Sequence, residues 1–340
     1  MHALLPNGLF SVPASLDDRQ AVQRGFFCAG WRLMWPKFDF QGHRGARGLQ
    51  PENTLPSIEV ALDHCVTAIE TDVHLTHDDV PVLCHDPYIT ERLCALVPGR
   101  TAVPPRDRPA VRSLTLEQLR CYRADTNPDS ARFPDQCADA TPLAGAFAAA
   151  RDIHPYAIPT LGDCIAFVID YAGDAGRAQG KTDEQRSAAA RLRFDLELKR
   201  KPFCPETIGD DFDGKRPGLL EHMVMKQVDQ AGVIDRTIVR SFDHRSVRAV
   251  RQLEPKVTTA ILVAGTAPID PVALVRDAGA QVYCPEYLFL DHQQVMQCHD
   301  QGVRVVPWTV NEVEDMKRLL DWQVDGMTTD YPNRLRVLLG

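Results

Sequence analysis

No stretch of 18 or more consecutive apolar residues occurs in the 340-residue chain. A membrane-spanning helix needs about 20 such residues, so we expect no stable membrane insertion. The beginning of the chain also lacks the basic region and apolar core of a secretion signal, because residues 1–10 are weakly apolar and residues 17–24 are polar. We therefore expect a cytoplasmic protein, with a periplasmic or secreted protein as the alternative.

Basic residues are fewer than acidic ones: the chain has 38 lysines and arginines and 46 aspartates and glutamates, which gives a formal net charge of −8. A general nucleic-acid binder carries a basic face, so this balance predicts no nucleic-acid partner. An anionic small molecule is not excluded, because a bound divalent cation and a few basic side chains can reverse the field locally.

Cysteine pairs at metal-site or redox spacing are absent, since none of the ten cysteines forms a C-x-x-C pair. Disulfide frameworks are typical of short secreted chains, so we expect most of these thiols to be reduced. Cys121 and Cys137 flank an irregular segment and are the best candidates for a disulfide.

Several common catalytic signatures are missing as well. The glycine-rich stretch 42–48 reads GHRGARG and does not match the dinucleotide-binding G-x-G-x-x-G, and the chain has neither a P-loop nor a G-x-S-x-G motif. Cys84 precedes His85, but side chains alternate along an extended segment, so the two would point apart. This disfavours a cysteine nucleophile.

Eight short apolar runs are present, and most are followed by amphipathic helical patterns. Parallel strands need long crossovers, so repeated strand–helix units indicate a parallel sheet. Eight units predict closure into a (β/α)8 TIM barrel, with a doubly wound open sheet as the alternative. The predicted strands are 38–43, 68–73, 192–198, 237–241, 257–262, 281–284, 303–308 and 326–329, and the predicted helices are 54–65, 161–171, 219–231, 244–253, 271–278, 292–301 and 313–320.

These patterns also divide the chain. We expect an N-terminal extension at residues 1–36 and a barrel domain at residues 37–340, interrupted after the second strand region by an insertion at approximately 87–158. A connection of that length is usually functional or a small subdomain, and we place it over the mouth of the barrel. Residues 173–187, rich in glycine and aspartate, are predicted to form a second, mobile polar loop.

Polar side chains stand at the ends of the predicted strands. In a (β/α)8 barrel the carboxyl ends of the strands form the active site, so these side chains should meet there. They are His43 and Arg44 after the first strand, Glu70 and Asp72 in the second, and Glu197 and Lys199 in the third.

Glu70 and Asp72 are two residues apart on one strand and therefore point to the same face. Two carboxylates in one cavity repel each other unless a cation is bound, and oxygen ligands favour Ca²⁺ or Mg²⁺ over zinc. Instead of binding a cation, Glu70 and Asp72 could form ion pairs with basic residues at the barrel rim, and Glu197 could pair with Lys199. His74 is in phase with the two acids and is a possible further ligand.

His43 and His85 can transfer protons near neutral pH, one as the base toward an attacking hydroxyl and the other as the acid toward a leaving alkoxide. Arg44 suits bidentate contact with phosphate oxygens, and Lys199 supplies a point charge. Trp308 could offer an apolar wall to a glycerol or headgroup, or simply pack at the top of the barrel.

Taken together and in order, these motifs resemble the glycerophosphodiester phosphodiesterase family. The resemblance runs from about residue 38 to 335 and so covers nearly all of the chain. The matching blocks are His43-Arg44-Gly45, Pro51-Glu52-Asn53-Thr54, Glu70-Thr71-Asp72-Val73, His85-Asp86, Glu197-Leu198-Lys199, Ser241-Phe242-Asp243, Trp308-Thr309-Val310-Asn311 and Asp325-Gly326-Met327-Thr328-Thr329-Asp330-Tyr331-Pro332.

The resemblance implies a (β/α)8 barrel and metal-dependent hydrolysis of a small-molecule glycerophosphodiester to an alcohol and glycerol 3-phosphate. The site residues that it implies are Glu70, Asp72 and Glu197 for one divalent cation, His43 and His85 for acid–base catalysis, and Arg44 and Lys199 for the phosphate. Glu52 and Asn53 precede a helix start and are interpreted as capping residues or as support behind the site.

Two other functions compete with this one. A related barrel lyase of the sphingomyelinase D or phosphatidylinositol phospholipase type would need an apolar patch near the barrel mouth, and no obvious membrane-binding stretch is present. A non-catalytic barrel that binds phosphodiesters would require the loss of a catalytic group, and none is missing. The motifs do not distinguish Ca²⁺ from Mg²⁺, one headgroup from another, or a monomer from an oligomer.

Overall fold

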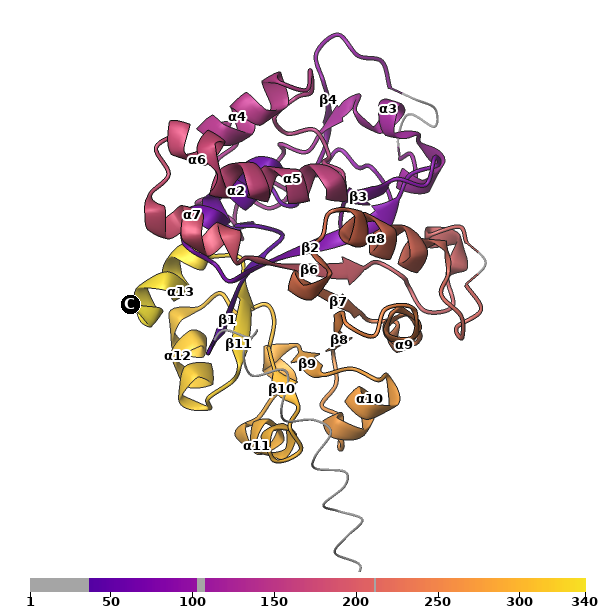
Figure 1. The fold of residues 1–340 in the computed structure, drawn as a ribbon, viewed down its shortest axis with the longest axis vertical. Helices are drawn as coiled ribbons and strands as arrows, with labels where there is room; N and C mark the ends of the chain where they lie inside the picture. The colour runs from indigo at the N-terminus through magenta and orange to yellow at the C-terminus, as the bar shows by residue number, and fades with distance from the viewer. Residues whose placement is uncertain (1–36, 103–107, 211) are drawn as a thin grey trace, which may run out of the picture. The chain divides into compact units, whose positions relative to one another are not determined.

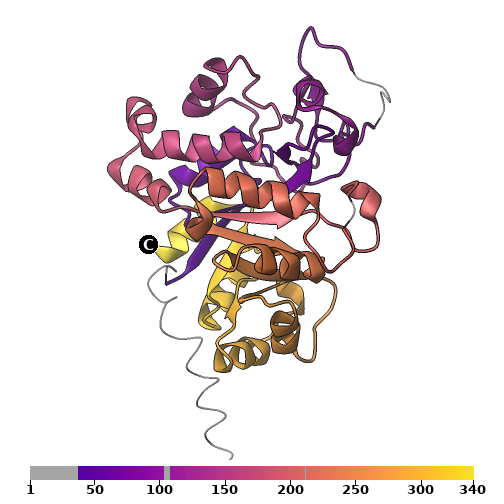
Figure 2. The same cartoon turned by 45° about the vertical axis from the view of Figure 1, so that its right-hand side comes forward.

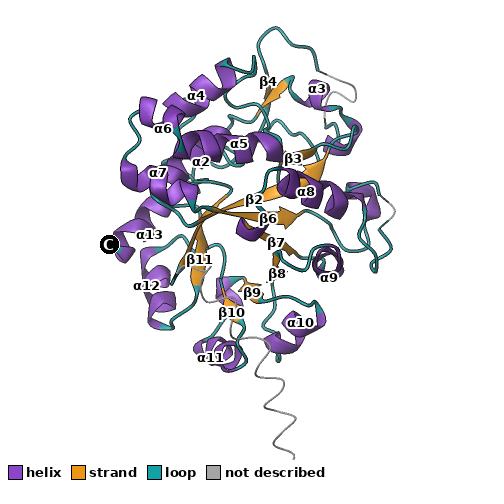
Figure 3. Ribbon diagram, in the orientation of Figure 1, coloured by secondary structure: helices purple, strands orange, loops and turns teal. Residues whose placement is uncertain are grey.

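The computed structural model of the chain describes residues 37–102, 108–210 and 212–340. The N-terminal extension expected at residues 1–36 lies outside the described residues. Eight parallel strands form a nearly closed barrel, and helices surround it (Figures 1 and 3). This architecture confirms the predicted (β/α)8 TIM barrel over the doubly wound sheet.

Neighbouring strands of the barrel pair in parallel. At the seam, the Asp325 amide donates to the Val305 carbonyl (2.9 Å) and the Thr328 amide to the Pro307 carbonyl (3.0 Å), which nearly closes the sheet. In spatial order the strands are β10 (Arg304–Val305), β9 (Val282–Pro285), β8 (Thr258–Val263), β7 (Thr237–Ser241), β6 (Arg193–Leu198), β2 (Ala68–Leu75), β1 (Asp39–His43) and β11 (Gly326–Thr329).

Helices lie outside the barrel and make the crossovers between strands. In α2 the Thr54 side chain accepts a hydrogen bond from the Ser57 amide (3.3 Å), which satisfies one of the free donors at the helix start. All seven predicted helices are present close to their predicted bounds. They are α2 (Leu55–Asp63), α5 (Leu161–Ala172), α8 (Leu219–Gln230), α9 (His244–Leu253), α10 (Pro271–Asp277), α11 (His292–Asp300) and α12 (Val313–Asp321).

The main apolar core fills the space between the barrel and its helices. Phe40 of β1 and Ile69 and Val73 of β2 belong to one cluster with Leu55 and Ile58 of α2, and all of them are buried. Because strand side chains alternate, the neighbouring residues of the same strands point into the barrel. The apolar side chains of these strands therefore pack against the surrounding helices, and the polar side chains point into the barrel.

The interior of the barrel is occupied by a hydrogen-bonded polar group. The Arg240 guanidinium donates to Asp195 Oδ1 (2.6 Å) and Gln41 Oε1 (2.6 Å), and Gln41 Nε2 donates to Asp195 Oδ2 (2.8 Å). Thr328 Oγ1 donates to the same Gln41 oxygen (2.7 Å). These bonds join β1, β6, β7 and β11, and the buried arginine charge is balanced by its aspartate.

The chain leaves the barrel between β3 (Pro81–Leu83), which pairs antiparallel with β2, and α5. Figures 1 and 2 show this segment on one side of the barrel strands. A small apolar cluster of its own, which includes Ile89, Leu114 and Leu119, lies within it. Its elements are β4 (Ala95–Leu96), the 3₁₀ turn η1 (Val111–Ser113), α3 (Leu116–Leu119), β5 (Tyr122–Arg123) and α4 (Pro142–Ala149).

The predicted polar loop at residues 173–187 is wrong, because helices α6 (Asp174–Ala178) and α7 (Asp183–Ala190) occupy most of it. Thr182 and Gln185 form a reciprocal capping box at the start of α7. Both helices are short and largely polar, so apolar periodicity does not reveal them.

Proline explains two further differences from the prediction. Helices α4 and α13 (Pro332–Leu339) each begin with a proline, which costs nothing at the first helical position. Neither helix is among those that apolar spacing predicts. Strand β10 is shorter than the predicted run 303–308, since Pro307 cannot donate to a ladder.

The nine cysteines among the described residues are free thiols. This agrees with the expectation that most are reduced. Cys121 and Cys137, the best candidates for a disulfide, are among the free ones, and Cys28 lies outside the described residues.

Candidate active site

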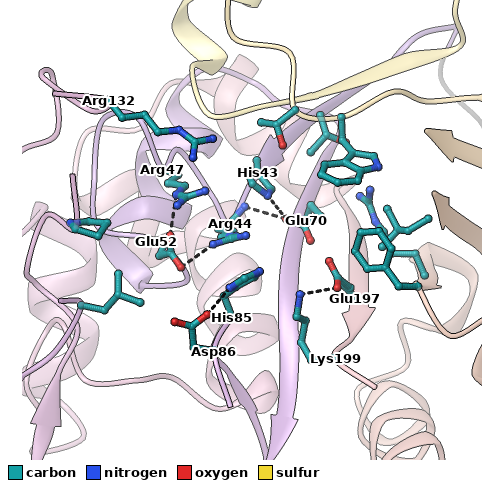
Figure 4. A pocket seen from close by; sticks show the side chains of 18 of the residues that line it. His43, Arg44, Arg47, Glu52, Glu70, His85, Asp86, Arg132, Glu197 and Lys199 are labelled. Carbon is teal, nitrogen blue, oxygen red and sulfur yellow. Dashed lines mark hydrogen bonds and ion pairs between the residues drawn. The ribbon is translucent and has the colours of Figure 1, made fainter. Parts of the chain in front are cut away.

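A cavity of about 390 Å³ opens at the carboxyl ends of the barrel strands (Figure 4). Of the site residues predicted from the sequence, all but Asp72 line it directly, and Asp72 is fully buried. Residues of the segment between β3 and α5 line the cavity too, among them Arg92 and Arg132. The cavity therefore lies between the barrel and this segment.

A tight turn after β1 places His43 and Arg44 beside the cavity. Arg44 and Gly45 have positive φ values of 50° and 83°, and a Cβ atom on Gly45 would lie 2.5 Å from Ser57 Oγ. Only glycine fits there without displacing α2. The Arg44 amide donates to Glu70 Oε2 (3.1 Å), and the Ser57 hydroxyl donates to the Arg44 carbonyl (2.9 Å). The turn is thereby fixed against β2 and α2.

Strand register brings the three predicted carboxylates together. His43 pairs with Glu70 across β1 and β2, and Asp72 pairs with Glu197 across β2 and β6. The oxygens that Glu70, Asp72 and Glu197 can offer to a metal ion all lie within 4.8 Å of one another, and all three residues are buried. The lateral pairing of strands 125 residues apart thus completes the group.

The electrostatics of this group fit a cation. Burial raises the pKa of Glu70 well above its ordinary value, and the nearby Asp72 raises it further. Burial also opposes ionisation of Asp72, but Arg44 and Lys199 outweigh it and lower the pKa of that carboxyl. The buried Oδ1 of Asp72 receives no hydrogen bond, and the Lys199 ammonium lies near it, at 3.3 Å. Clustered carboxylate oxygens are ligands that hard divalent ions prefer.

Both predicted phosphate contacts are held by carboxylates. Lys199 Nζ lies 2.6 Å from Glu197 Oε1 and 3.3 Å from Asp72 Oδ1. Arg44 Nε lies 3.1 Å from Asp72 Oδ2, and its Nη1 lies 2.8 Å from Glu52 Oε1. The Glu197–Lys199 ion pair, an alternative given by the sequence, is therefore present. Burial opposes the charge of Lys199, yet Asp72 and Glu197 raise its pKa, so it remains protonated.

His43 is oriented by a carboxylate that follows the last strand of the barrel. Its Nδ1 lies 2.6 Å from Asp330 Oδ1, and Asn311 Nδ2 holds the other oxygen of Asp330 (2.8 Å). Burial lowers the pKa of His43 to about 4, against the raising effect of Asp330. A neutral ring that donates from Nδ1 leaves Nε2 free to accept a proton. That Nε2 atom lies 3.8 Å from Glu70 Oε2.

His85 has the same kind of partner, since its Nδ1 lies 2.7 Å from Asp86 Oδ1. About a third of its side chain is exposed, and it lines the cavity (Figure 4). Behind it, Nε2 of the buried His74 contacts the His85 carbonyl (3.2 Å). His74 is not part of the carboxylate group, and its Nε2 is engaged by the His85 carbonyl instead.

Glu52 and Asn53 support the site from behind. Glu52 accepts ion pairs from both arginines of the first loop, at 2.8 and 2.7 Å. Asn53 has a positive φ of 55°, donates to Asp72 Oδ2 (2.8 Å) and accepts from the Asp72 amide (3.3 Å). Neither residue caps the following helix, because its N-cap is Thr54. The capping interpretation is wrong, and both residues instead orient charged groups of the site.

One wall of the cavity is apolar. The Trp308 and Phe242 rings pack edge to face with centroids 5.5 Å apart, and Leu262 also lines the cavity. Trp308 Nε1 donates to the Cys284 carbonyl (2.9 Å), which fixes the ring. Trp308 thus both packs at the barrel top and faces the cavity.

Four residues that contact the site have no role assigned from the sequence. Asp86 and Asp330 orient the two histidines, and both have a signal in the sequence, because one adjoins His85 and the other follows a predicted strand. Arg92 and Arg132 lie in the long connection, and nothing in their local sequence indicates that they reach the cavity. Only the tertiary structure reveals them.

Exposed apolar side chains lie on the loops that follow four consecutive strands, β6 to β9. They are Phe203 (87 % exposed), Phe242 (37 %), Ile269 (98 %), Leu288 (66 %) and Phe289 (36 %). Parallel strands direct these loops to one end of the barrel, where the cavity also opens. Among the described residues, none of the helices has the length and apolar character needed to span a bilayer.

Comparison with known sequences gives consistent matches over most of the chain. The model of a family described as the glycerophosphoryl diester phosphodiesterase family matches residues 43–201 and 209–334. A glycerophosphodiester phosphodiesterase of Caldanaerobacter subterraneus subsp. tengcongensis is 26% identical over 293 residues, which cover 86% of this chain and 94% of the relative. One of Bacillus subtilis is 26% identical over 298 residues, covering 86% and 83%.

Solved structures show the same fold. A structure from Silicibacter pomeroyi, assigned as a glycerophosphoryl diester phosphodiesterase, has a TM-score of 0.68 and 27% identity, with 89% of this chain and 93% of that chain covered. A phosphodiesterase from Oleispira antarctica, solved with the product sn-glycerol-3-phosphate, has a TM-score of 0.64 and 19% identity, covering 90% and 97%.

Proposed function

The chain belongs to the glycerophosphoryl diester phosphodiesterase family and is a phosphoric diester hydrolase, and we propose that it splits glycerophosphodiesters by metal-dependent catalysis with two histidines. The products would be an alcohol and sn-glycerol 3-phosphate, the product held by the Oleispira structure. One observation carries the proposal: three buried carboxylates form one group beside two histidines, each paired with an acid.

We assign one divalent cation, Ca²⁺ or Mg²⁺, to Glu70, Asp72 and Glu197, whose oxygens suit a hard ion. When bound, such an ion supplies Lewis-acid stabilisation of charge on the phosphate oxygens. Lys199 forms ion pairs with Asp72 and Glu197. Once the cation occupied these carboxylates, the Lys199 ammonium would contact the substrate phosphate. Arg44 would contribute a second positive charge from the β1 loop.

The two histidines would exchange protons with the reacting oxygens. Hydrogen bonds to Asp330 and Asp86 occupy Nδ1 of His43 and His85, so Nε2 of each ring is available to the substrate. One Nε2 would take the proton of the attacking hydroxyl, and the other would return a proton to the leaving alkoxide. The acids fix ring orientation and tautomer, as the carboxylate does in a serine-protease triad.

The test is release of glycerol 3-phosphate from glycerophosphocholine by the full chain. We expect turnover with Ca²⁺ or Mg²⁺ and none with excess chelator. Glu197→Gln should raise the ion concentration needed for half-maximal activity at least about tenfold, whereas Glu314→Gln, an exposed change on α12, should leave it unchanged. Full activity in chelator would overturn the metal assignment.

A second substrate class is favoured by the exposed apolar loops at the barrel mouth. Phe203, Ile269 and Leu288 are among the most exposed apolar side chains described, and Phe242 lines the cavity as well. An acyl chain on the glycerol part of a lysophospholipid could pack against such a surface. This is the feature that a lipid-cleaving barrel enzyme requires.

Lysophosphatidylcholine and glycerophosphocholine, which share a headgroup, separate these two classes. If the loops bind an acyl chain, Phe203→Ser with Leu288→Ser should lower kcat/KM for the lysophospholipid and leave the deacylated diester unaffected. Absence of lysophospholipid turnover in the wild type would exclude the second class and leave the first intact.

A further inference from the structure

The cavity carries positive charge on one side that the proposed reaction does not use. Arg47 of the β1 loop and Arg132 of the β3–α5 connection lie there, and Arg92 of the same connection also lines the cavity. We propose that these three arginines form an anion subsite for the alcohol part of the substrate, so that the enzyme prefers glycerophosphodiesters whose alcohol bears a carboxylate or a phosphate monoester. This inference rests on the proposed function and specifies its substrate class.

Two of the three arginines, Arg92 and Arg132, differ from the other cations of the cavity in their partners, whereas Arg47 pairs with Glu52 (2.7 Å). Arg44 and Lys199 each contact two carboxylates, at 2.6 to 3.3 Å. Arg92 and Arg132 are exposed, line the cavity, and form no ion pair with an acid within the described parts of the chain. Their charges are therefore available to a ligand in a way that the charges of Arg44 and Lys199 are not.

Arg47 and Arg132 are held close together although both are positively charged. Their guanidinium carbons lie 4.6 and 5.1 Å from the centroid of the same ring, that of the buried Phe133. Figure 4 shows the two side chains next to each other, on the opposite side of the cavity from Glu197 and Lys199. Burial lowers the pKa of Arg47, and the charges of Arg44 and Arg132 lower it further, only partly offset by Glu52 and Asp330. A bound anion would relieve this repulsion.

Hydrogen bonds hold the backbone around Arg132 in place, and one of them comes from the barrel. The Arg132 amide donates to Asp129 Oδ1 (3.1 Å), and the Tyr331 hydroxyl donates to the Arg132 carbonyl (3.2 Å). Gln136 Nε2 donates to the Arg47 carbonyl (2.7 Å). Because the chain around both arginines is already ordered, a bound anion would have little backbone freedom left to remove.

The shape of a phosphodiester matches the two sides of the cavity. The phosphate must lie near the histidines and carboxylates, and one organic group extends from it on each side. Phe242 and Trp308 form an apolar wall suited to the carbon atoms of an uncharged glycerol. The arginine side would then receive the alcohol, and guanidinium groups bind carboxylate and phosphate oxygens in the same forked geometry.

The experiment compares substrates that differ by one anionic group. Glycerophosphoserine differs from glycerophosphoethanolamine by a carboxylate, and glycerophosphoinositol 4-phosphate differs from glycerophosphoinositol by a phosphate monoester. We expect wild-type enzyme to have a higher kcat/KM for the anionic member of at least one pair. Arg132→Gln and Arg92→Gln should each reduce that ratio about 3- to 10-fold, as expected for partly exposed charged contacts. The exposed Arg100→Gln, outside the cavity, should not change it.

The two substrate pairs also distinguish a subsite for a carboxylate from a subsite for a phosphate monoester. Ratios near one for both pairs, or ratios that Arg132→Gln leaves unchanged, would overturn the anion subsite while the hydrolase assignment stands. If none of the four diesters is hydrolysed, the proposed function fails. The anion subsite is then tested by calorimetry, which measures the dissociation constant of each diester from the His43→Ala variant. Equal dissociation constants for the two members of each pair would overturn the subsite.

Discussion

At the scale of single residues, the site consists of ionisable groups whose neighbours decide their protonation. Asp330 orients His43 and Asp86 orients His85, so each ring is left with Nε2 toward the cavity. Arg44 keeps Asp72 ionised, whereas burial favours the protonated form of Glu70. Proton affinity in this site is therefore set by packing as much as by residue type.

The two histidines should be separable from the rest of the site by mutation. Replacing His43 or His85 by alanine should lower kcat with glycerophosphocholine about 10²- to 10⁴-fold, the usual contribution of general acid–base catalysis. His222→Ala, an exposed change on α8, is the control and should retain wild-type turnover. Near-wild-type kcat in both active-site variants would refute the acid–base assignment.

His74 should make the fold sensitive to acid. Burial lowers the pKa of His74 to about 4 from an ordinary 6.5. The unfolded chain therefore takes up a proton near pH 6.5 that the folded chain takes up only near pH 4, so the free energy of unfolding falls as pH decreases between these values. His74→Gln should remove about 3 kcal/mol of that loss.

Urea unfolding of wild type and His74→Gln at pH 7 and pH 4 measures this difference, with His222→Gln as the exposed control. If His74→Gln loses as much stability on acidification as the wild type does, His74 is not the source of the acid sensitivity.

At the scale of elements, one buried carboxylate joins three segments. Glu59 of α2 accepts hydrogen bonds from the amides of Leu143 (3.3 Å) and Ala144 (2.8 Å) and from the Thr141 hydroxyl, and it also contacts Lys181 Nζ (2.7 Å). It thereby caps helix α4 from outside, since Thr141 makes no capping bond of its own. The connection that reaches the cavity is in this way attached to the barrel's first helix.

Removing this carboxylate should loosen the attachment. We expect Glu59→Ala to lower the free energy of unfolding by about 3 kcal/mol, because two helix amides and the Thr141 hydroxyl lose their buried acceptor and Lys181 keeps only one of its two acidic partners, Asp63. Glu59→Gln, which keeps one acceptor oxygen, should cost less. The exposed Glu184→Ala should cost no more than about 1 kcal/mol, the usual value of a surface ion pair. Equal losses for Glu59→Ala and Glu184→Ala in urea titrations would contradict this role.

At the scale of the whole molecule, the barrel brings together carboxylates whose mutual repulsion opposes folding. Glu70, Asp72 and Glu197 come from two strands far apart in the chain. An ion that binds only the folded chain should stabilise it by about 2.7 kcal/mol at a concentration one hundred times its dissociation constant.

Thermal unfolding with and without Ca²⁺ or Mg²⁺ measures this stabilisation. The Tm of the wild type should rise by several degrees with the ion, and Glu197→Gln should lose most of the rise. An unchanged wild-type Tm at millimolar concentrations of both ions would contradict a metal site at these carboxylates.

The sequence predicted the barrel because strand and helix periodicities are local. The runs at 237–241 and 326–329 coincide with β7 and β11, and the helix at 244–253 coincides with α9. Elements without apolar periodicity were missed, among them the polar helix α7 and the proline-initiated α4. For His74, alternation gives the face of the strand but not the partner, which is the His85 carbonyl.

What the sequence alone determined is the set of groups: two histidines, three carboxylates, an arginine and a lysine, each placed at a strand end by a motif that is local in the chain. What only the tertiary structure decided is how those charges are distributed. Strand register sets Glu197 beside Asp72, and the pairing of β1 with β11 sets Asp330 against His43. The β3–α5 connection carries Arg92 and Arg132 to the cavity. These contacts join residues far apart in the chain, and only the packed fold brings their charges within reach of one another.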